Sequence, residues 1–232
     1  RTARSRTSGG NCLGIVTIFL KEDSGIKPGT VHAQESSVCE WEDINVMDNL
    51  KPRRPDAAEV ELIGGIENRQ LGLKNYDDRW PSMYLDHQRR IGAALSATEV
   101  GIEHIGSTSV PGLAAKPIID IVVTVQDITA EEDYLDVLVA AGYELRVREP
   151  GHRMVRTPAR DVHVHILERG DPAVDDYLLL RDQLRTDADD RALYERNKRV
   201  LLTQAWDDMN AYAEAKSEVI SAIKARARGR RA

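Results

Sequence analysis

The sequence predicts an α/β or α+β domain that ends in a helical segment. Two features indicate this fold class: strand-like and helix-like apolar patterns alternate through the middle of the chain, and three helical patterns follow one another at its end. The composition agrees with a folded domain, because 41% of the 232 residues are hydrophobic and the formal net charge is only −6. Such a chain is neither disordered as a whole nor fibrous.

The domain is expected to occupy residues 59–232. Residues 1–58 contain a Ser-Gly-Gly run, short apolar runs and a basic, proline-bearing stretch at 51–55, with no sustained apolar period. The sequence therefore predicts that this segment is a poorly structured N-terminal extension that ends in a linker. Its two cysteines, Cys12 and Cys39, are too few for a disulfide framework or a four-thiolate zinc site.

The first elements of the domain are expected to be a short strand near 71–74 and a helix that begins at Trp80. Pro81 suits the first turn of this helix, where its missing N–H would have no partner anyway. Strands are predicted at 100–105 and 117–125. The second of these is almost continuously β-branched, which is typical of a strand buried on both faces near the centre of a sheet.

The second half of the predicted domain adds one strand and four helices. Apolar residues at 134–139 indicate a helix that Gly142 ends. Residues 162–167 alternate between apolar and polar side chains, the period of a half-buried strand. Helical patterns then follow at 177–184, 188–206 and 209–223.

A phosphate site is expected where the strand at 100–105 runs into a Gly-Ser-Thr-Ser turn. Gly106 would let the backbone approach a ligand, and Ser107, Thr108 and Ser109 would offer hydroxyl and N–H groups to an anion. A capped turn without a ligand is the alternative. On the following apolar strand, Asp120 would be costly to bury unless it is paired, hydrogen-bonded or bound to a cation.

Three histidines near these strands are candidate functional groups. His163 and His165 lie two residues apart on a predicted strand, so both imidazoles should project from one face, where they could bind a divalent metal or a phosphate. They could equally form the polar side of a half-buried strand. His104, just before the Gly-Ser turn, could act as an acid or base near neutral pH, or support the loop by a hydrogen bond.

Three cations are candidates for contact with phosphate. Lys116 precedes the strand of Asp120, and its charge could offset that of a phosphate or remain solvated. Arg181 and Lys198 have helical spacings that could place them over the same cleft, although pairing with nearby surface carboxylates is the other reading.

The segment 104–121 resembles the signature of the GrpB family, whose members have the nucleotidyltransferase fold of DNA polymerase β. The similarity covers roughly residues 59–225. It extends to the motifs at 76–81, 162–165 and 181–185, and to Tyr194, Lys198, Tyr212 and Lys216. In some actinobacterial proteins a domain of this kind follows a dephospho-CoA kinase domain. Residues 1–58 contain no Gly-x-x-x-x-Gly-Lys-Ser/Thr loop, so we expect no kinase activity.

The resemblance implies a nucleotidyltransferase-like mixed β-sheet flanked by helices, in which a Gly-Ser turn holds the triphosphate of a nucleotide and carboxylates hold Mg²⁺ or Mn²⁺. Gly106 and Ser107 match that turn, and Asp120 matches the first Asp of the family fold's Asp-x-Asp pair. Val122 replaces the second Asp, and the two histidines of the 162–167 strand stand where a third carboxylate often lies. Two-metal transfer depends on such carboxylates.

The expected function is a cytoplasmic domain that binds a nucleoside triphosphate or another phosphorylated small molecule with a divalent metal. It could transfer a nucleotidyl group to an unidentified acceptor, with Asp120 and His104 as catalytic groups. One alternative is a noncatalytic ligand-binding or protein-interaction module, and another is a metal hydrolase centred on His163 and His165. No window reaches the ~20 apolar residues of a membrane span. The acidic charge balance argues against nucleic acid as a partner.

Overall fold

The computed structural model describes residues 53–65, 72–203 and 215–231. Most of the predicted extension, both cysteines and the start of the strand predicted at 71–74 lie outside the described residues. Within them, residue 74 contributes an isolated bridge to Ala115 in place of a strand. Among the helices of these ranges, none has both the length and the apolar character that crossing a bilayer requires.

The centre of the molecule is a mixed sheet, as expected. Its six strands have the spatial order β1-β4-β5-β6-β3-β2, and all neighbours are antiparallel except the parallel pair β3 and β6. The strands are β1 (Glu61–Leu62), β2 (Gly101–Ile105), β3 (Ile119–Val125), β4 (Glu144–Glu149), β5 (His152–Arg156) and β6 (Val162–Glu168). The β-branched strand β3 is second from one edge, because β1, β4 and β5 extend the sheet beyond β6.

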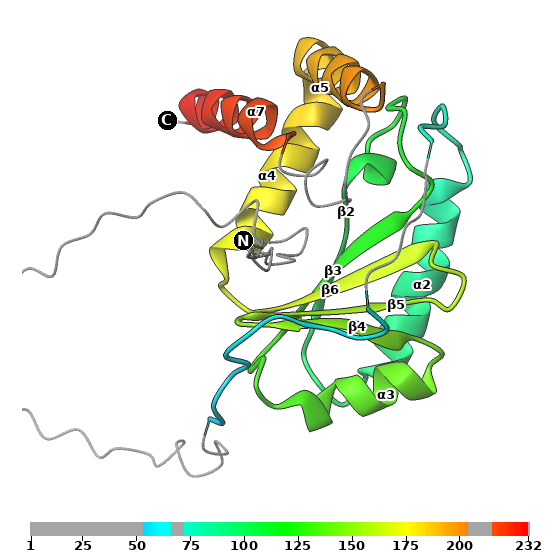
Figure 1. Ribbon diagram of the computed structural model, residues 1–232, viewed down its shortest axis with the longest axis vertical. Coiled ribbons are helices and arrows are strands. Elements are labelled where there is room, and N and C mark those ends of the chain that lie inside the picture. Colours follow the sequence, from blue (N-terminus) through cyan, green and yellow to red (C-terminus); the bar gives the residue numbers. More distant parts are fainter. Residues whose placement is uncertain (1–52, 66–71, 204–214, 232) are drawn as a thin grey trace, which may run out of the picture.

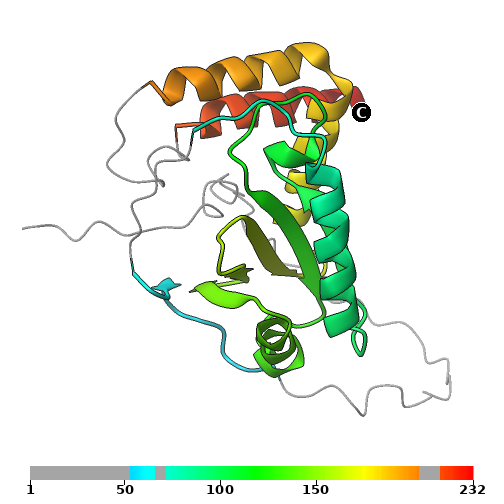
Figure 2. The ribbon, with the colours of Figure 1, turned by 90° about the vertical axis from the view of Figure 1, so that its right-hand side faces the viewer.

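One group of helices covers one face of the sheet. A second group stands together at one end of the opposite face (Figures 1 and 2). On the first face lie α2 (Trp80–Ala94) and α3 (Leu135–Ala140), which share the main core with β3 and β6. The other group comprises α4 (Pro172–Thr186), α5 (Ala188–Leu201) and α7 (Ser217–Arg231). Figure 2 shows α5 and α7 side by side above the sheet. The sheet face that α4 borders is the one that carries the polar residues of interest.

The helices largely follow the predicted segments, and the differences have local causes. Helix α4 begins at Pro172, before the predicted start at 177, because the Asp171 side chain accepts a hydrogen bond from the Ala173 N–H and so caps the helix. Gly142 follows α3 with a φ of 94°, the left-handed conformation that favours glycine. Part of the helix predicted at 209–223 lies outside the described residues, and α7 continues to Arg231.

The hairpin of β4 and β5 was not among the predicted elements, because its charged residues hide the strand pattern. Arg146 and Arg153 are nevertheless buried, since they bind partners remote in sequence. Arg146 donates to the carbonyl of Gly65, and Arg153 forms ion pairs with Asp56 and Glu131. These contacts satisfy the charge that burial would otherwise penalise.

The described N-terminal residues contact the domain. Arg53 forms an ion pair with Glu168 at 2.8 Å, Arg54 pairs with Glu132 at 2.7 Å, and Asp56 pairs with Arg153 at 2.7 Å. These contacts lie on the N-terminal side of residue 59, where the domain was predicted to begin.

Candidate metal and phosphate site

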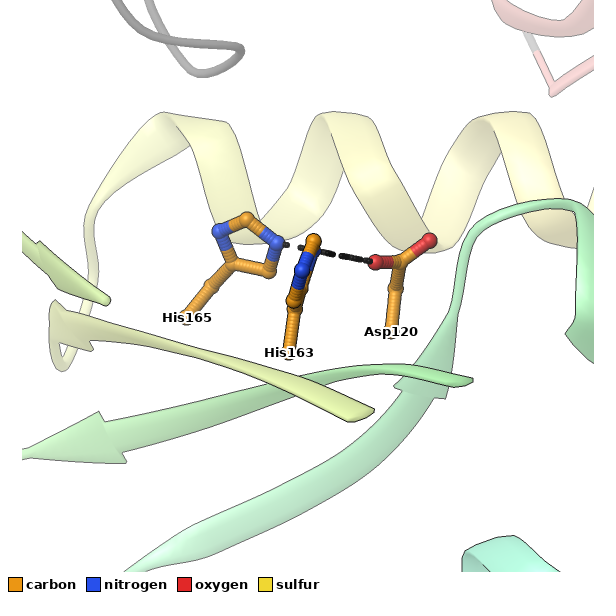
Figure 3. Close-up of side chains that lie close together, drawn as sticks. All are labelled: Asp120, His163 and His165. Atoms are coloured by element: carbon orange, nitrogen blue, oxygen red, sulfur yellow. Dashed lines mark ion pairs between the residues drawn. The ribbon is translucent and has the colours of Figure 1, made fainter. Parts of the chain in front are cut away.

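The parallel pairing of β3 and β6 brings Asp120, His163 and His165 together. Asp120 and His163 are directly opposite each other in the register, and His165 is two residues further along β6, on the same face. The distance from Asp120 Oδ1 to His163 Nδ1 is 3.6 Å, and to His165 Nε2 it is 3.9 Å. Figure 3 shows the three side chains projecting to the same side of the two strands, where α4 passes.

These three residues form a group that could hold a metal ion. One ligand atom from each lies within 4.8 Å of the other two. The donors are two imidazole nitrogens and one carboxylate oxygen, a set that suits transition-metal ions better than Mg²⁺, which prefers oxygen ligands. Burial acts to raise the pKa of Asp120, but its contact with His165 and the charges of the two imidazoles outweigh burial and hold the pKa below its ordinary value. The carboxylate is therefore ionised and available to a cation.

Val122 stands where a second carboxylate was looked for, and its side chain is apolar. This side chain is 1% exposed and packs with Ile105, Leu167, Ala173 and Tyr177 under α4. The face of β3 thus changes from polar to apolar within two residues. The site offers the mixed histidine and aspartate set in place of paired carboxylates.

Gly106 forms the turn that leads from β2 past Asp120. Its φ is 69° and its ψ −174°, a conformation that is essentially reserved for glycine. The three hydroxyl residues that follow have different roles. The Ser109 hydroxyl donates to the Gly106 carbonyl at 2.6 Å, and the Thr108 hydroxyl donates to the Ile118 carbonyl at 3.1 Å, so both brace the loop. Ser107 instead contacts a lysine.

That lysine is Lys198 of α5, whose side chain is buried beside the turn. Its Nζ donates to Ser107 Oγ at 3.0 Å and to the Ala114 carbonyl at 2.6 Å. Burial, together with the positive charge of Lys216, lowers the pKa of Lys198 to about 7. Lys116 and Lys216 are close enough to interact with the Asp120 charge, and burial lowers the pKa of each to about 8. Three lysines with lowered pKa values therefore lie near the turn and Asp120.

Two of the sequence-predicted residues are not brought to this group. His104 pairs in the sheet with Ile121, so its side chain lies on the face opposite Asp120. There it stacks on Tyr84 of α2 with ring centroids 4.6 Å apart, and its Nε2 lies 3.2 Å from Thr108 Oγ1. Burial lowers its pKa to about 4, so the ring is neutral and supports the loop.

Arg181 is the second predicted site residue that does not join Asp120, His163 and His165. It lies on α4 and forms an ion pair with Glu103 at 2.7 Å and with Asp182 at 2.8 Å. It also donates to the His104 carbonyl at 3.2 Å. These partners occupy the guanidinium, so Arg181 joins α4 to the edge strand β2.

Glu149 and His152 lie behind the pair of His163 and His165, and they were not predicted from the sequence. His152 of β5 places its Nε2 3.2 Å from His165 Nδ1, and its Nδ1 lies 2.6 Å from Glu149 Oε1. The sequence carries a signal for them, because Glu149 and His152 flank Pro150-Gly151, a dipeptide that marks a turn. Recognising the hairpin would have placed Glu149 opposite His152, on the two strands of that hairpin.

The comparisons with known proteins agree with this architecture. Residues 70–226 match the model of the family described as GrpB protein. A UPF0157 protein of Streptomyces coelicolor is 69% identical over 175 residues, which are 75% of this chain and 94% of that protein. A dephospho-CoA kinase of Mycolicibacterium paratuberculosis is 30% identical over 191 residues, and the match covers 68% of this chain but only 47% of the kinase.

Among solved structures, the conserved protein GrpB from Enterococcus faecalis superposes with a TM-score of 0.59 and 29% identity, covering 67% of this chain and 96% of that one. The Cid1 poly(U) polymerase gives a TM-score of 0.43 with 16% identity over 56% of this chain. The length of the family match and the identity to the Streptomyces protein lead to one conclusion. The chain belongs to the GrpB family, and it shares the fold of the Enterococcus faecalis GrpB protein.

Proposed function

We propose that this protein binds a phosphorylated small molecule, of the class of nucleoside triphosphates, through a divalent metal ion held by Asp120, His163 and His165. The observation that carries the proposal is the convergence of three ligand atoms within 4.8 Å at the edge of the Gly-Ser turn. A cation at this point would satisfy the Asp120 carboxylate and leave coordination positions for an incoming phosphate oxygen.

The lysines support an anionic ligand. Burial disfavours the charged forms of Lys198, Lys116 and Lys216, and each pKa is lowered accordingly. A polyphosphate would add negative charge that favours the protonated form of each lysine. Ser107, already in contact with Lys198, would offer its hydroxyl at the same place.

The donor set fits a transition-metal ion such as Mn²⁺ or Zn²⁺ better than Mg²⁺. When bound, the ion would supply positive charge that draws in and polarises a phosphate group. Asp120 and the two imidazoles would hold it, and the lysines would orient the remaining phosphates.

Binding without turnover is a second candidate function, and Val122 favours it. Phosphoryl and nucleotidyl transfer by two metals depends on carboxylates that hold both ions, and at Val122 the chain offers a buried apolar side chain. Release of pyrophosphate on incubation with triphosphates and a cell extract would establish transfer. Its absence, with binding retained, would establish a ligand-binding domain.

Calorimetry tests the proposal. We expect ATP, GTP, CTP or UTP to bind in the presence of Mn²⁺, and the binding to be lost without the metal and in Asp120→Asn. Asp86→Asn is the matched control, because this exposed residue of α2 pairs only with its helix neighbour Arg89 among the contacts described. If no triphosphate binds with any of Mn²⁺, Zn²⁺ or Mg²⁺, or if Asp120→Asn binds as the native protein does, the proposal is wrong.

A further inference from the structure

A carboxylate from the first described residues reaches the turn that stands behind the candidate metal site. Asp56 accepts a hydrogen bond from the backbone N–H of Gly151 at 2.5 Å and another from Nη2 of Arg153 at 2.7 Å. Gly151 belongs to the Pro150-Gly151 turn between β4 and β5, and Arg153 is the second residue of β5. Asp56 therefore holds the hairpin at its turn and near the start of its second strand.

We propose that Asp56 is a positioning residue for the metal site, because it fixes the hairpin whose His152 packs against the metal ligand His165. The inference rests on the metal site proposed above and deepens it. It makes the metal affinity depend on a residue that is not a ligand of the ion and that lies before the predicted start of the domain at 59.

Arg153 connects Asp56 to both ends of the turn. Its Nη1 donates to the carbonyl of Glu149 at 2.8 Å and to that of His152 at 3.1 Å. These two residues are opposite each other in the register of β4 and β5. The side chain of Arg153 is only 3% exposed, so the guanidinium is enclosed together with its partners. The backbone on either side of the turn is thus tied to the group that Asp56 binds.

His152 is the residue through which the hairpin meets the metal site. Its ring stacks on that of His165, with centroids 5.3 Å apart and planes 20° from parallel. Nε2 of His152 lies 3.2 Å from Nδ1 of His165, whichever of the two nitrogens carries the proton. His152 is 2% exposed and His165 is 4% exposed. In so closely packed a place, a rotation of the His165 ring requires His152 to move.

Removal of the Asp56 carboxylate would loosen this arrangement. In Asp56→Ala, the Gly151 N–H and Nη2 of Arg153 lose their acceptor, and an enclosed donor without an acceptor is costly. The hairpin lowers that cost by shifting until these donors meet water, and the shift carries His152 away from its contact with His165. Loss of a group that orients a metal ligand lowers metal affinity by about 10- to 100-fold. Asp56 acts one contact further out, so we expect about 10-fold.

The test is calorimetry with Zn²⁺ and Mn²⁺, each alone, on the full chain below the temperature at which unfolding begins. We expect Asp56→Ala to bind about 10-fold more weakly than the native protein. Arg54→Ala is the matched control, because Arg54 pairs with Glu132 at 2.7 Å, outside the hairpin. Ile91→Val controls for lost stability alone, because Ile91 belongs to the core that α2 shares with the opposite face of the sheet. Both controls should bind metal as the native protein does.

A purely structural role for Asp56 would lower the thermal stability and leave the metal affinity of the folded protein unchanged. A folded Asp56→Ala protein with native affinity therefore overturns the inference. Equal weakening in Arg54→Ala or Ile91→Val also overturns it, because the effect would then not pass through the hairpin. If Asp56→Ala does not fold, Asp56→Asn replaces it under the same criteria, since its amide keeps one acceptor oxygen for the turn.

A second readout separates this inference from the proposed function. NMR of the full chain with ¹³C-labelled histidine follows the ring signals of His165 without metal. We expect these signals to shift or broaden in Asp56→Ala and to keep their native positions in Arg54→Ala. Unchanged His165 signals in Asp56→Ala overturn the positioning role, whether or not the native protein binds metal. If the native protein binds neither Zn²⁺ nor Mn²⁺ while the His165 signals respond to Asp56→Ala, the metal site is overturned and the control of His165 by Asp56 stands.

Discussion

Gly106 and Asp120 are so close that glycine alone fits at the turn: a Cβ placed on Gly106 would lie 2.5 Å from Asp120 Oδ2. The turn and the carboxylate therefore form one unit, in which the backbone of the loop limits where Asp120 can point. This contact explains why the Gly-Ser turn and the acidic strand, separate in sequence, form a single site.

Gly106→Ala should therefore displace Asp120 and abolish metal binding. The positive φ alone costs about 1–3 kcal/mol for a residue with a side chain, and the contact with Asp120 adds to it. Gly112→Ala is the control, because Gly112 has a φ of 76° but nothing within 4 Å of its Cβ position. We expect urea denaturation to show a larger loss for Gly106→Ala, and calorimetry to show metal binding retained only in Gly112→Ala. Equal metal binding by the two variants would contradict the coupling.

Val122→Asp should destabilise the protein without creating a second metal ligand. The new carboxylate would enter the apolar cluster with Tyr177 and Leu167, where an unpaired charge is far more costly than a lost methyl group. Val122→Ala serves as the comparison and should cost about 2 kcal/mol, the scale of a small cavity. Thermal denaturation measures the difference. A stable Val122→Asp protein with tighter Mn²⁺ binding would show that the position can accept the missing carboxylate.

The strands that carry the site could be predicted from the sequence alone, because their patterns are local. The β-branched run of β3 and the alternation around His163 and His165 indicate strands wherever the chain folds, and the resemblance to the GrpB family correctly implied that the two lie together. The orientation of His104 could not be predicted in the same way. It depends on whether Ile105 or His104 shares a face with Asp120, which is set by the register between β2 and β3.

Apart from the turn dipeptide Pro150-Gly151, the hairpin of β4 and β5 shows no local strand pattern, because its charged residues are buried by partners far away in sequence. Arg153 appears as a surface charge until Asp56 and Glu131 are known to surround it. His152 was missed for the same reason, since its partner His165 is on another strand. Charged residues that are buried through long-range pairs leave no periodic signal.

Asp56→Ala should lower the free energy of unfolding by about 1–3 kcal/mol, because it leaves the buried Arg153 guanidinium with Glu131 as its remaining carboxylate. Asp56 also accepts hydrogen bonds from the backbone N–H groups of Gly151 and Ala57. The control Asp86→Ala breaks an exposed pair and should cost less than about 0.5 kcal/mol. Urea denaturation compares them. An Asp56→Ala protein as stable as the control would mean that the contacts of Asp56 contribute nothing to the stability of the fold.

Lys198 should make the stability of the ligand-free protein rise with pH above neutrality. Its pKa is about 7 in the folded protein, lowered from 10.5 chiefly by burial. Between these two values the unfolded chain keeps a proton that the folded protein has released, so stability increases with pH across this window. The contribution of one such group is at most about 1.4 kcal/mol per pH unit.

Urea denaturation of the native protein and Lys198→Met at pH 7, 8 and 9 measures this contribution, with the exposed Lys74→Met as control. We expect the native protein to gain stability relative to Lys198→Met as the pH rises, while Lys74→Met runs parallel to the native protein. A bound polyphosphate should reverse the dependence, because it holds Lys198 in its charged form and its own binding then weakens as the proton is lost. Parallel pH profiles for the native protein and Lys198→Met would show that the amine beside Ser107 is charged throughout this range, and that its burial is already compensated without a ligand.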